Sequence, residues 1–330
     1  MTEILPNPDL FVAMYVKKEA VLSSQIEGTQ ASLIDVLDVE DVGNSYKEKN
    51  VEEVINYIKA MNYGLNRLEQ LPLSLRLLRE IHEILLENVR GAERSPGEFR
   101  KTQNWIGPPG CTLKTATFVP PPHHDMLEAM NKLETYFYAD DFLPPLVKIG
   151  LVHAQFETIH PFLDGNGRMG RLLITFWLCQ QKILTKPLLY LSYFFKINRT
   201  EYYDRLMDIR LKGDWENWIK FFLKGIAQVS VEATETAKKI LKMKDEHTKT
   251  IKLTIKNPVN GLQLLEKLFE YPIITINKVA ELLDVTYPTA NSLVAEFCNQ
   301  KILTYDPKIQ RNKKFRYLNY IELLESGTEL

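Results

Sequence analysis

The segment HPFLDGNGRMGR, from His160 to Arg171, brings together the residue types that a phosphate-transfer site needs. The loop contains Gly165, Asn166 and Gly167, which can adopt backbone angles that most residues avoid. If a helix begins at this loop, its first backbone amides point at one spot, and the helix dipole adds positive potential there. The loop therefore predicts a nest for a phosphate group.

Four charged or titratable side chains accompany this nest. Arg168 and Arg171 are one helical turn apart, so both guanidinium groups can reach phosphate oxygens from the same helix end. Asp164 offers a hard oxygen ligand for a Mg²⁺ ion that takes its other ligands from water and phosphates, and Mn²⁺ fits equally well. His160 can accept a proton from an attacking hydroxyl. A capped helix start with surface arginines is the alternative, but the order of these groups favours phosphoryl or nucleotidyl transfer.

Two apolar helices must position this segment. Residues 146–158 before it and residues 168–181 after it are apolar on most of their surface, so we expect both helices to be buried. The stretch 91–122 is interrupted by Gly and Pro and predicts a long loop, and long loops inside compact domains usually have a function. Within it, TFVPPP at residues 117–122 predicts a short extended segment that the prolines end.

The rest of the chain predicts a mainly α protein, because apolar residues recur at three- and four-residue steps. We expect an N-terminal helical region (1–73), a catalytic region (74–230), a helical connector (231–257) and a C-terminal unit (258–330). An acidic, Gly-containing connection is expected near residues 35–46. The other expected helices cover residues 10–26, 51–68, 75–85, 126–138, 201–226 and 231–249.

The C-terminal unit has the order of a winged helix. Two short helices are expected on either side of residues 284–288, and two alternating segments, 302–305 and 315–318, flank a basic turn and predict a hairpin. The absence of Lys and Arg between residues 284 and 300 favours target recruitment or dimerisation over DNA binding. DNA contact stays open through polar residues of the second helix, which could read base edges, and through basic residues of the hairpin. These are Thr286, Tyr287, Thr289, Asn291 and Ser292, and Lys308, Arg311, Lys313, Lys314 and Arg316.

The composition excludes some classes of protein. The 330 residues include 41 Lys and Arg against 42 Asp and Glu, so no net charge attracts nucleic acid. Three separated cysteines predict neither a disulfide framework nor a zinc site. No secretory signal, long apolar run or lipidation motif occurs, so we expect a cytoplasmic protein without a membrane partner.

HPFLDGNGRMGR resembles the signature of the Fic (filamentation induced by cAMP) family and matches it at every fixed position. The resemblance extends to NWIGPPG at residues 104–110 and FVPPP at residues 118–122, which are similar to the flap that pairs with a target backbone. YYDRL at residues 202–206 resembles the segment near the adenine, and the resemblance covers roughly residues 1 to 230. It implies an all-helical core with a short β-hairpin flap.

The resemblance implies a protein adenylyltransferase that moves AMP from ATP to a Ser, Thr or Tyr hydroxyl of a target protein and of itself. His160 would deprotonate the hydroxyl, Asp164 would hold Mg²⁺, and Arg171 would bind the γ-phosphate. Gly165 to Gly167 with Arg168 would hold the α- and β-phosphates. Further nucleotide contacts would come from Met169, Gly170 and Tyr202, and the target-docking flap would be Thr117, Phe118, Val119 and Pro120.

The segment SSQIEG, from Ser23 to Gly28, ends the first expected helix, with Gly28 as its C-terminal cap. A carboxylate such as Glu27 in the last turn of a helix is unfavourable unless it is paired. The segment resembles the family's inhibitory motif, whose glutamate pairs with the second signature arginine, here Arg171. That pairing would leave ATP in an unreactive pose, so we expect low basal activity.

Three other interpretations stay open. The same glutamate is implicated in hydrolytic removal of AMP in some relatives, so a de-AMPylase of the same fold is one of them. A winged-helix transcriptional regulator with a vestigial nucleotide site is the second. The third, an interaction scaffold without turnover, is disfavoured by the intact His160 and Asp164, because neither is needed to bind a protein. A homodimer is compatible with each.

Overall fold

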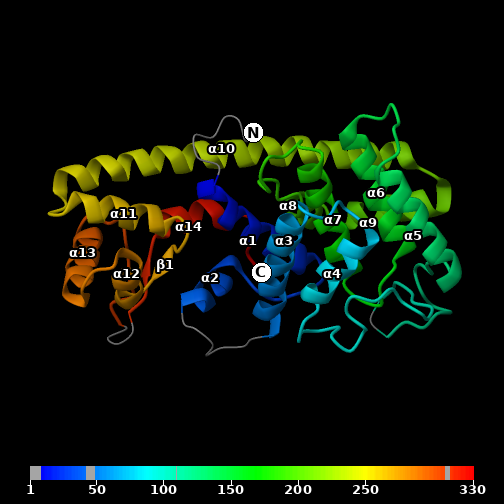
Figure 1. Ribbon diagram of the computed structural model, residues 1–330, viewed down its shortest axis with the longest axis horizontal. Helices are drawn as coiled ribbons and strands as arrows, with labels where there is room; N and C mark the ends of the chain where they lie inside the picture. Colours follow the sequence, from blue (N-terminus) through cyan, green and yellow to red (C-terminus); the bar gives the residue numbers. More distant parts are fainter. Residues whose placement is uncertain (1–8, 42–48, 109, 309–312) are drawn as a thin grey trace.

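The computed structural model describes residues 9–41, 49–108, 110–308 and 313–330 (Figure 1). Its described residues form helices and a sheet of two short antiparallel strands, which confirms the prediction of a mainly α protein. The helices before the C-terminal unit are α1 (Asp9–Ile26), α2 (Leu33–Asp41), α3 (Lys49–Arg67), α4 (Leu75–Leu85), α5 (His123–Phe137), α6 (Pro145–Ile159), α7 (Asn166–Gln180), α8 (Ser192–Ile197), α9 (Arg199–Lys212) and α10 (Trp215–Thr254). The C-terminal unit contains α11 (Pro258–Leu268), β1 (Ile273–Ile274), α12 (Ile276–Leu283), α13 (Tyr287–Asn299), β2 (Phe315–Arg316) and α14 (Leu318–Glu325).

Helices α6 and α7 form the centre of the catalytic region. They pack against each other, and α3 packs on both α4 and α7. Helix α1 contacts α3, α7 and α8, so the N-terminal region covers one side of α7. Nearly every residue of α7 from Asn166 to Leu178 is buried. The loop between α6 and α7 therefore lies where the N-terminal and catalytic helices meet.

Helix α10 connects the two ends of the molecule. It is 40 residues long and runs along one edge of Figure 1, from α6 and α9 to α11 and α14. The single expected helix over residues 201–226 is wrong, because Gly213 adopts left-handed angles (φ 68°) and ends α9. Asp214 then caps α10 by accepting a hydrogen bond from the backbone N–H of Asn217. Residue 231, where we expected a connector to begin, lies inside this continuous helix.

The expected connection at residues 35–46 is also wrong in its first part, which belongs to α2. Ser32 and Asp35 form a reciprocal cap, since the Asp35 carboxylate accepts from the Ser32 N–H (2.8 Å) and the Ser32 hydroxyl accepts from the Asp35 N–H (3.3 Å). Val36 and Leu37 of this helix are buried. The acidic residues that suggested a connection thus include a helix cap. Residues 42–48 lie outside the described part of the chain.

The C-terminal unit has the expected order of helices, with differences in its strands. β2 pairs with β1 in antiparallel register, Ile273 opposite Arg316, and Thr304 forms a further bridge to Arg316. Residue Leu318, expected in a strand, begins α14 instead. Helix α14 packs on α10, α1 and α2, and this burial of its apolar face outweighs the alternating pattern. Arg311 lies outside the described residues.

The C-terminal unit is docked on the N-terminal region through polar contacts. Lys314 Nζ donates to the backbone oxygen of Asp38 (3.0 Å), and Arg316 Nη2 lies 3.4 Å from the Asp38 carboxylate. Gln25, inside the SSQIEG segment, donates from Nε2 to the backbone oxygen of Thr328 (2.8 Å). Two basic residues expected on the wing therefore face the N-terminal region. Among the described residues, no helix has the length and apolarity required to cross a membrane.

Candidate active site

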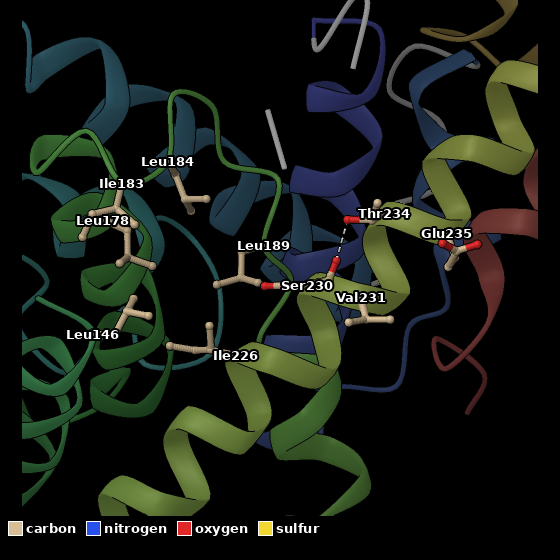
Figure 2. Close-up of a pocket in the computed structure, with 10 residues that line it drawn as sticks. All are labelled: Leu146, Leu178, Ile183, Leu184, Leu189, Ile226, Ser230, Val231, Thr234 and Glu235. Atoms are coloured by element: carbon tan, nitrogen blue, oxygen red, sulfur yellow. Dashed lines mark hydrogen bonds between the residues drawn. The ribbon is translucent and has the colours of Figure 1, made fainter. Parts of the chain in front are cut away.

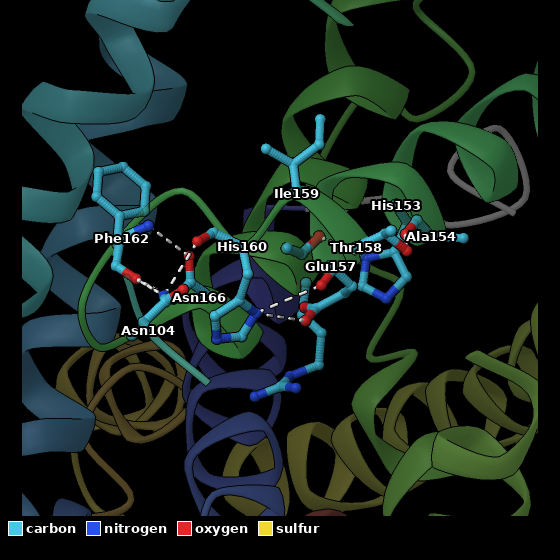
Figure 3. A network of polar contacts seen from close by, with 12 residues as sticks. Asn104, His153, Ala154, Glu157, Thr158, Ile159, His160, Phe162 and Asn166 are labelled. Carbon is cyan, nitrogen blue, oxygen red and sulfur yellow. Dashed lines mark hydrogen bonds and ion pairs between the residues drawn. The ribbon is translucent and has the colours of Figure 1, made fainter. Parts of the chain in front are cut away.

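The loop after α6 begins with a strained histidine. His160 has positive backbone angles (φ 51°, ψ 62°), which are uncommon for a residue with a side chain, and its N–H donates to Phe156 O at 2.9 Å. The side chain of Asn166 accepts from the Phe162 N–H (2.9 Å) and donates to Phe162 O (2.8 Å), so it fixes the loop from the α7 side. Asn104 donates to the backbone oxygens of His160 (3.2 Å) and Phe162 (2.8 Å) (Figure 3). The histidine is thus held by groups on both sides of the loop.

The start of α7 has the features of a phosphate nest. Gly165 adopts left-handed angles (φ 75°) just before the first helical residue. Arg168 is 1% exposed, and its Nε and Nη1 atoms have no hydrogen-bond partner among the described residues. Arg171 is 2% exposed, and its Nη1 atom also has no hydrogen-bond partner among the described residues. Buried guanidinium nitrogens without partners are costly, so these groups are ready for an anion.

Carboxylates from two different places in the chain flank Arg168. Arg168 Nη1 lies 3.7 Å from Glu53 Oε2, and Arg168 Nη2 lies 3.8 Å from Asp164 Oδ1. The side chain of Asp164 is 35% exposed, and its Oδ1 accepts from the Gly165 N–H at 2.6 Å. Glu53 is 4% exposed and accepts a 2.6 Å hydrogen bond from the hydroxyl of Thr29. Glu53 was not predicted from the sequence, although it stands between two apolar residues, Val51 and Val54, that are buried with it.

The predicted partner of Glu27 is in contact with it. Arg171 Nη2 donates to Glu27 Oε1 at 2.8 Å, while Arg171 Nε donates to the Ser23 hydroxyl (2.8 Å) and Nη2 to the Ser23 backbone oxygen (2.9 Å). Gly28 has φ 92°, which suits the end of α1, and a Cβ atom at Gly167 would overlap Glu27 Oε1. Burial favours the neutral acid, but Arg171 and Arg168 outweigh it and lower the pKa of Glu27. Glu27 is therefore an anion bound in the nest.

The flap residues lie beside the histidine loop. Ile106 and Phe118 form an antiparallel bridge, with Ile106 N–H donating to Phe118 O (2.8 Å) and Phe118 N–H to Ile106 O (3.0 Å). Thr117 and Val119 are exposed, whereas Pro120 is buried. The guanidinium carbon of Arg210 lies 4.0 Å from the centre of the Phe118 ring, which is cation–π distance. Arg210, which the sequence analysis missed, thus links the flap to α9.

Two of the predicted nucleotide contacts, Tyr202 and Gly170, meet at His153 of α6. Tyr202 is 1% exposed, and its hydroxyl lies 2.9 Å from His153 Nε2. The other ring nitrogen of His153 lies 2.9 Å from the backbone oxygen of Gly170, and Met169 is buried. Tyr203, the next residue, is 37% exposed. A nucleotide role for Tyr202, Met169 and Gly170 remains a prediction, and Tyr203 is the more accessible ring.

A metal ion would have to be held mainly by Asp164. The described residues contain no cluster of three or more His, Cys, Asp and Glu side chains suited to a metal. A single half-buried carboxylate beside buried, unpartnered guanidinium nitrogens fits an ion that arrives with phosphate groups, because Mg²⁺ keeps most of its ligands as water and phosphate oxygens. The residues present therefore fit Mg²⁺ bound together with a nucleotide.

A second cavity lies away from this loop (Figure 2). Its volume is about 460 Å³, and it lies between α10 and the segment that follows α7. Its lining is mostly aliphatic, and none of these residues belongs to the signature. The residues are Leu146, Leu178, Ile183, Leu184, Leu189, Ile226, Ser230, Val231, Thr234 and Glu235. Such a lining does not suit a charged nucleotide.

Comparison with known proteins identifies two family models in the chain. Residues 72–178 match the Fic/DOC family, and residues 1–66 match the Fic/DOC family N-terminal model. The protein adenylyltransferase Fic of Drosophila grimshawi is 30% identical over 169 residues, which are 48% of this chain and 33% of that protein. The protein of the same name from Culex quinquefasciatus is 28% identical over 207 residues, 59% of this chain and 37% of its own. The chain thus spans about a third of the length of the curated relatives it matches.

Solved structures share the fold at low sequence identity. A Fic family protein from Desulfovibrio desulfuricans G20 aligns with a TM-score of 0.58 and 19% identity over 92% of this chain and 86% of that one. A Fic domain containing signaling protein from Bacteroides thetaiotaomicron aligns with a TM-score of 0.54 and 19% identity over 71% of this chain and 90% of its own. At these identities the likeness concerns the fold.

Proposed function

Since the chain belongs to the Fic/DOC family, whose two models match residues 1–66 and 72–178, we propose that it transfers AMP from ATP to a hydroxyl side chain of a target protein. The single observation that carries this proposal is the nest at the start of α7, where two buried arginines present unpartnered nitrogens next to His160 and Asp164. The curated relatives named as protein adenylyltransferases support the choice of AMP. A plain phosphate-binding site would not need the histidine.

Each signature residue has a role that its position supports. His160 accepts the proton of the attacking Ser, Thr or Tyr hydroxyl, and the hydroxyl oxygen bonds to the α-phosphorus. The bond from the α-phosphorus to the bridging oxygen of the β-phosphate breaks, and pyrophosphate leaves. The backbone amides of residues 165–167 and the guanidinium of Arg168 bind the α- and β-phosphates, and Arg171 binds the γ-phosphate. Asp164 would hold Mg²⁺, which would neutralise part of the phosphate charge.

The flap supports a protein as the acceptor. Among the described residues, the flap is paired through the isolated bridge between Ile106 and Phe118, and an extended segment of another protein could add to its other edge. Val119, at 44% exposed, and Trp105, at 42% exposed, supply apolar surface for such a segment. We therefore propose that the target docks by strand addition, with its hydroxyl directed at His160.

The basal state in this proposal is inhibited. Glu27 forms an ion pair with the guanidinium of Arg171, so the γ-phosphate cannot accept hydrogen bonds from the same N–H groups. Arg171 is fully engaged by Glu27 and Ser23 except at Nη1. ATP would then bind with its phosphates displaced from the reactive arrangement, and positioning accounts for most of the catalysis in this kind of transfer.

Removal of AMP from a modified protein is the second candidate, and one observation favours it. Burial has the largest influence on the pKa of both Glu27 and His160. The two groups also influence each other, since Glu27 raises the pKa of His160 and His160 lowers the pKa of Glu27. An ionised carboxylate at that place can orient a water molecule toward an AMP group. DNA binding has less support, because Lys314 and Arg316 contact Asp38 and helix α13 contains no Lys or Arg.

The experiment compares wild type, Glu27→Gly and Glu27→Gly/His160→Ala, each incubated in lysate with Mg²⁺ and ATP that carries a label on the α- or the γ-phosphate. We expect α-label in protein, strongest in the single variant and lost in the double variant. Incorporation of γ-label would indicate a kinase instead. If no protein is labelled, AMP release from a premodified protein, compared between wild type and Glu27→Gly, separates the second candidate from an inactive site.

A further inference from the structure

A glutamate one turn before His160 lies beside Nδ1 of the histidine ring. Glu157 is 5% exposed, and its Oε2 atom lies 4.0 Å from His160 Nδ1 (Figure 3). Its backbone oxygen lies 3.4 Å from the same ring nitrogen. The Oε1 atom of Glu157 has no hydrogen-bond partner among the described residues. Burial of a carboxylate without a full set of hydrogen-bond partners lowers the stability of the fold, which indicates a functional role for Glu157.

The packing keeps the carboxylate at this place. A Cβ atom at Gly170 would overlap Glu157 Oε1, so the glycine of the signature provides the space that the carboxylate fills. The backbone oxygen of Glu157 accepts a 2.9 Å hydrogen bond from Arg210 Nη2. Thr158, the next residue, lies 3.3 Å from Arg210 Nε through its hydroxyl. The last turn of α6 is therefore fixed from α7 and from α9.

The charges around His160 create a need for such a carboxylate. Burial lowers the pKa of His160, Arg210 and Arg100 lower it further, and it falls to about 4. A histidine in this state is a weak base, since the imidazolium that forms when it accepts a proton is opposed by both arginines. Glu27 acts in the other direction, but in the proposed function Glu27 must leave before ATP reacts. Glu157 is in place to supply the negative charge at that stage.

We propose that Glu157 is the positioning residue for His160: its carboxylate faces the Nδ1–H group, keeps Nε2 free to accept the proton of the target hydroxyl, and stabilises the imidazolium that results. This inference rests on the proposed function, because it names the support of the same base. The proton moves from the hydroxyl to Nε2 while the Nδ1 proton stays between the ring and Glu157. Carboxylates hold catalytic imidazoles in this way in unrelated enzymes.

The charge of Glu157 depends on the state of Glu27. Burial raises the pKa of Glu157, Arg171 lowers it, Glu27 raises it and Arg210 lowers it, with the result at about 7. Glu27 directly follows α1, Arg171 belongs to α7 and Arg210 to α9. His153, which contacts both Gly170 and Tyr202, also lies near Gly170 and the Glu157 carboxylate. Departure of Glu27 removes a negative charge near Glu157, and Arg171 acts on Glu157 without this competitor until the γ-phosphate binds. Release of Glu27 would thus favour the ionised form of Glu157, which then replaces Glu27 as the negative charge near His160.

The test uses the full chain in the Glu27→Gly background, with Glu157→Gln as the variant and Glu128→Gln, an exposed glutamate of α5, as the control. We expect Glu157→Gln to lower kcat by about 10- to 100-fold with the KM for ATP unchanged, as for loss of support to a general base. The acid limb of the pH–rate profile should move to lower pH. Gly170→Ala, which displaces the carboxylate, should lower kcat as well. Equal kcat and equal pH profiles in parent and Glu157→Gln would overturn the proposal.

A second measurement does not depend on activity. Nitrogen NMR of the His160 ring in the Glu27→Gly protein reports which ring nitrogen carries the proton and at which pH the ring titrates. We expect protonated Nδ1 in the parent, and in Glu157→Gln a titration at least about half a pH unit lower. Unchanged tautomer and titration would contradict the proposal even if no transfer of AMP is found. A changed titration without any activity would leave the geometry intact and reject the proposed function.

Discussion

Arg171 and Glu27 are 144 positions apart in the chain, and yet Arg171 Nη2 donates to Glu27 Oε1 at 2.8 Å inside the phosphate nest. Ser23 holds the same guanidinium through its hydroxyl and its backbone oxygen. The N-terminal helix thus competes with the nucleotide for one cation. Because the guanidinium of Arg171 is buried, removal of Glu27 leaves a buried positive charge that should bind another anion strongly.

The first prediction concerns the charge of Glu27. Glu27→Gln keeps the shape of the side chain and removes its charge, so Arg171 should bind the γ-phosphate in its place. We expect automodification about 10- to 100-fold faster than in wild type, because a charge-assisted hydrogen bond contributes about 1.5–3 kcal/mol. The measurement is incorporation of α-labelled AMP with time. Glu69→Gln, which changes an exposed glutamate after α3, is the control. Identical rates in wild type and Glu27→Gln would contradict competition for Arg171.

The second prediction concerns His82, a histidine of α4 that supports the signature loop. Its ring stacks on Phe162 at 3.7 Å, its Nδ1 accepts from the Gly97 N–H (2.9 Å) and its Nε2 lies 3.0 Å from Asp164 O. The bond that Nδ1 accepts requires the neutral ring, and burial lowers the pKa of His82 to about 4. The unfolded chain, with a histidine pKa of about 6.5, binds more protons between these values. Stability should therefore fall as the pH drops from about 6.5 to 4.

The matching variant is His82→Phe, which keeps a ring against Phe162 and cannot titrate. Wild type should lose up to about 1.4 kcal/mol of unfolding free energy per pH unit through this histidine alone. Urea unfolding at several pH values between 4 and 7 measures the slope. His153 and His160 also have lowered pKa values, so His82→Phe should reduce the slope by about one proton and leave the remainder. Parallel slopes in both proteins would exclude a neutral His82 in the folded state.

The sequence was sufficient to predict the parts of the site that lie close together in the chain. The apolar runs on both sides of the signature predicted α6 and α7, and the glycines predicted the turn between them. Glu53, Glu157 and Arg210 were missed because each belongs to a helix whose pattern is explained by packing alone. Their roles depend on which helices meet around Arg168 and His160, and pairwise distances of this kind are set by the tertiary fold.

The errors in the fold have a similar origin. Helix α2 was missed because its acidic residues suggested a solvated connection, whereas Asp35 accepts hydrogen bonds from Ser32. Helix α14 was missed because a short alternating segment was continued past β2. In both cases, burial against α1 and neighbouring helices decides the structure of a short segment whose own preference is weak.

The third prediction concerns Asn166, whose side chain closes the signature loop on itself. Asn166→Asp keeps the acceptor for Phe162 N–H and removes the donor to Phe162 O, so two oxygens meet in a buried place. We expect a loss of about 1–3 kcal/mol of unfolding free energy, and a melting temperature lower by several degrees. Asn131→Asp on the exposed side of α5 is the control. A melting temperature equal to that of the control would mean that the loop does not depend on this donor.

The last prediction concerns the C-terminal segment after α14, which is bound to the inhibitory segment. Lys196 Nζ donates to Gln25 Oε1 (2.7 Å) and to the backbone oxygens of Gly327 (2.9 Å) and Glu329 (2.8 Å). Gln25, which lies between Ser23 and Glu27 in the chain, donates in turn to Thr328 O. One lysine thus ties the last residues of the structure to the segment that occupies Arg171. We expect Lys196→Met to detach this connection.

The loss of these hydrogen bonds should make departure of Glu27 easier without changing the nest. Each contributes about 0.5–1.5 kcal/mol, so automodification should rise by roughly 2- to 10-fold, less than in Glu27→Gly. Lys224→Met, on the exposed side of α10, is the matched control, and both proteins are compared for AMP incorporation and melting temperature. A lower melting temperature with unchanged automodification would mean that the C-terminal segment stabilises the fold and does not restrain Glu27. A rise in automodification would instead connect the C-terminal unit to control of the site, because the same unit is held on α2 by Asp38.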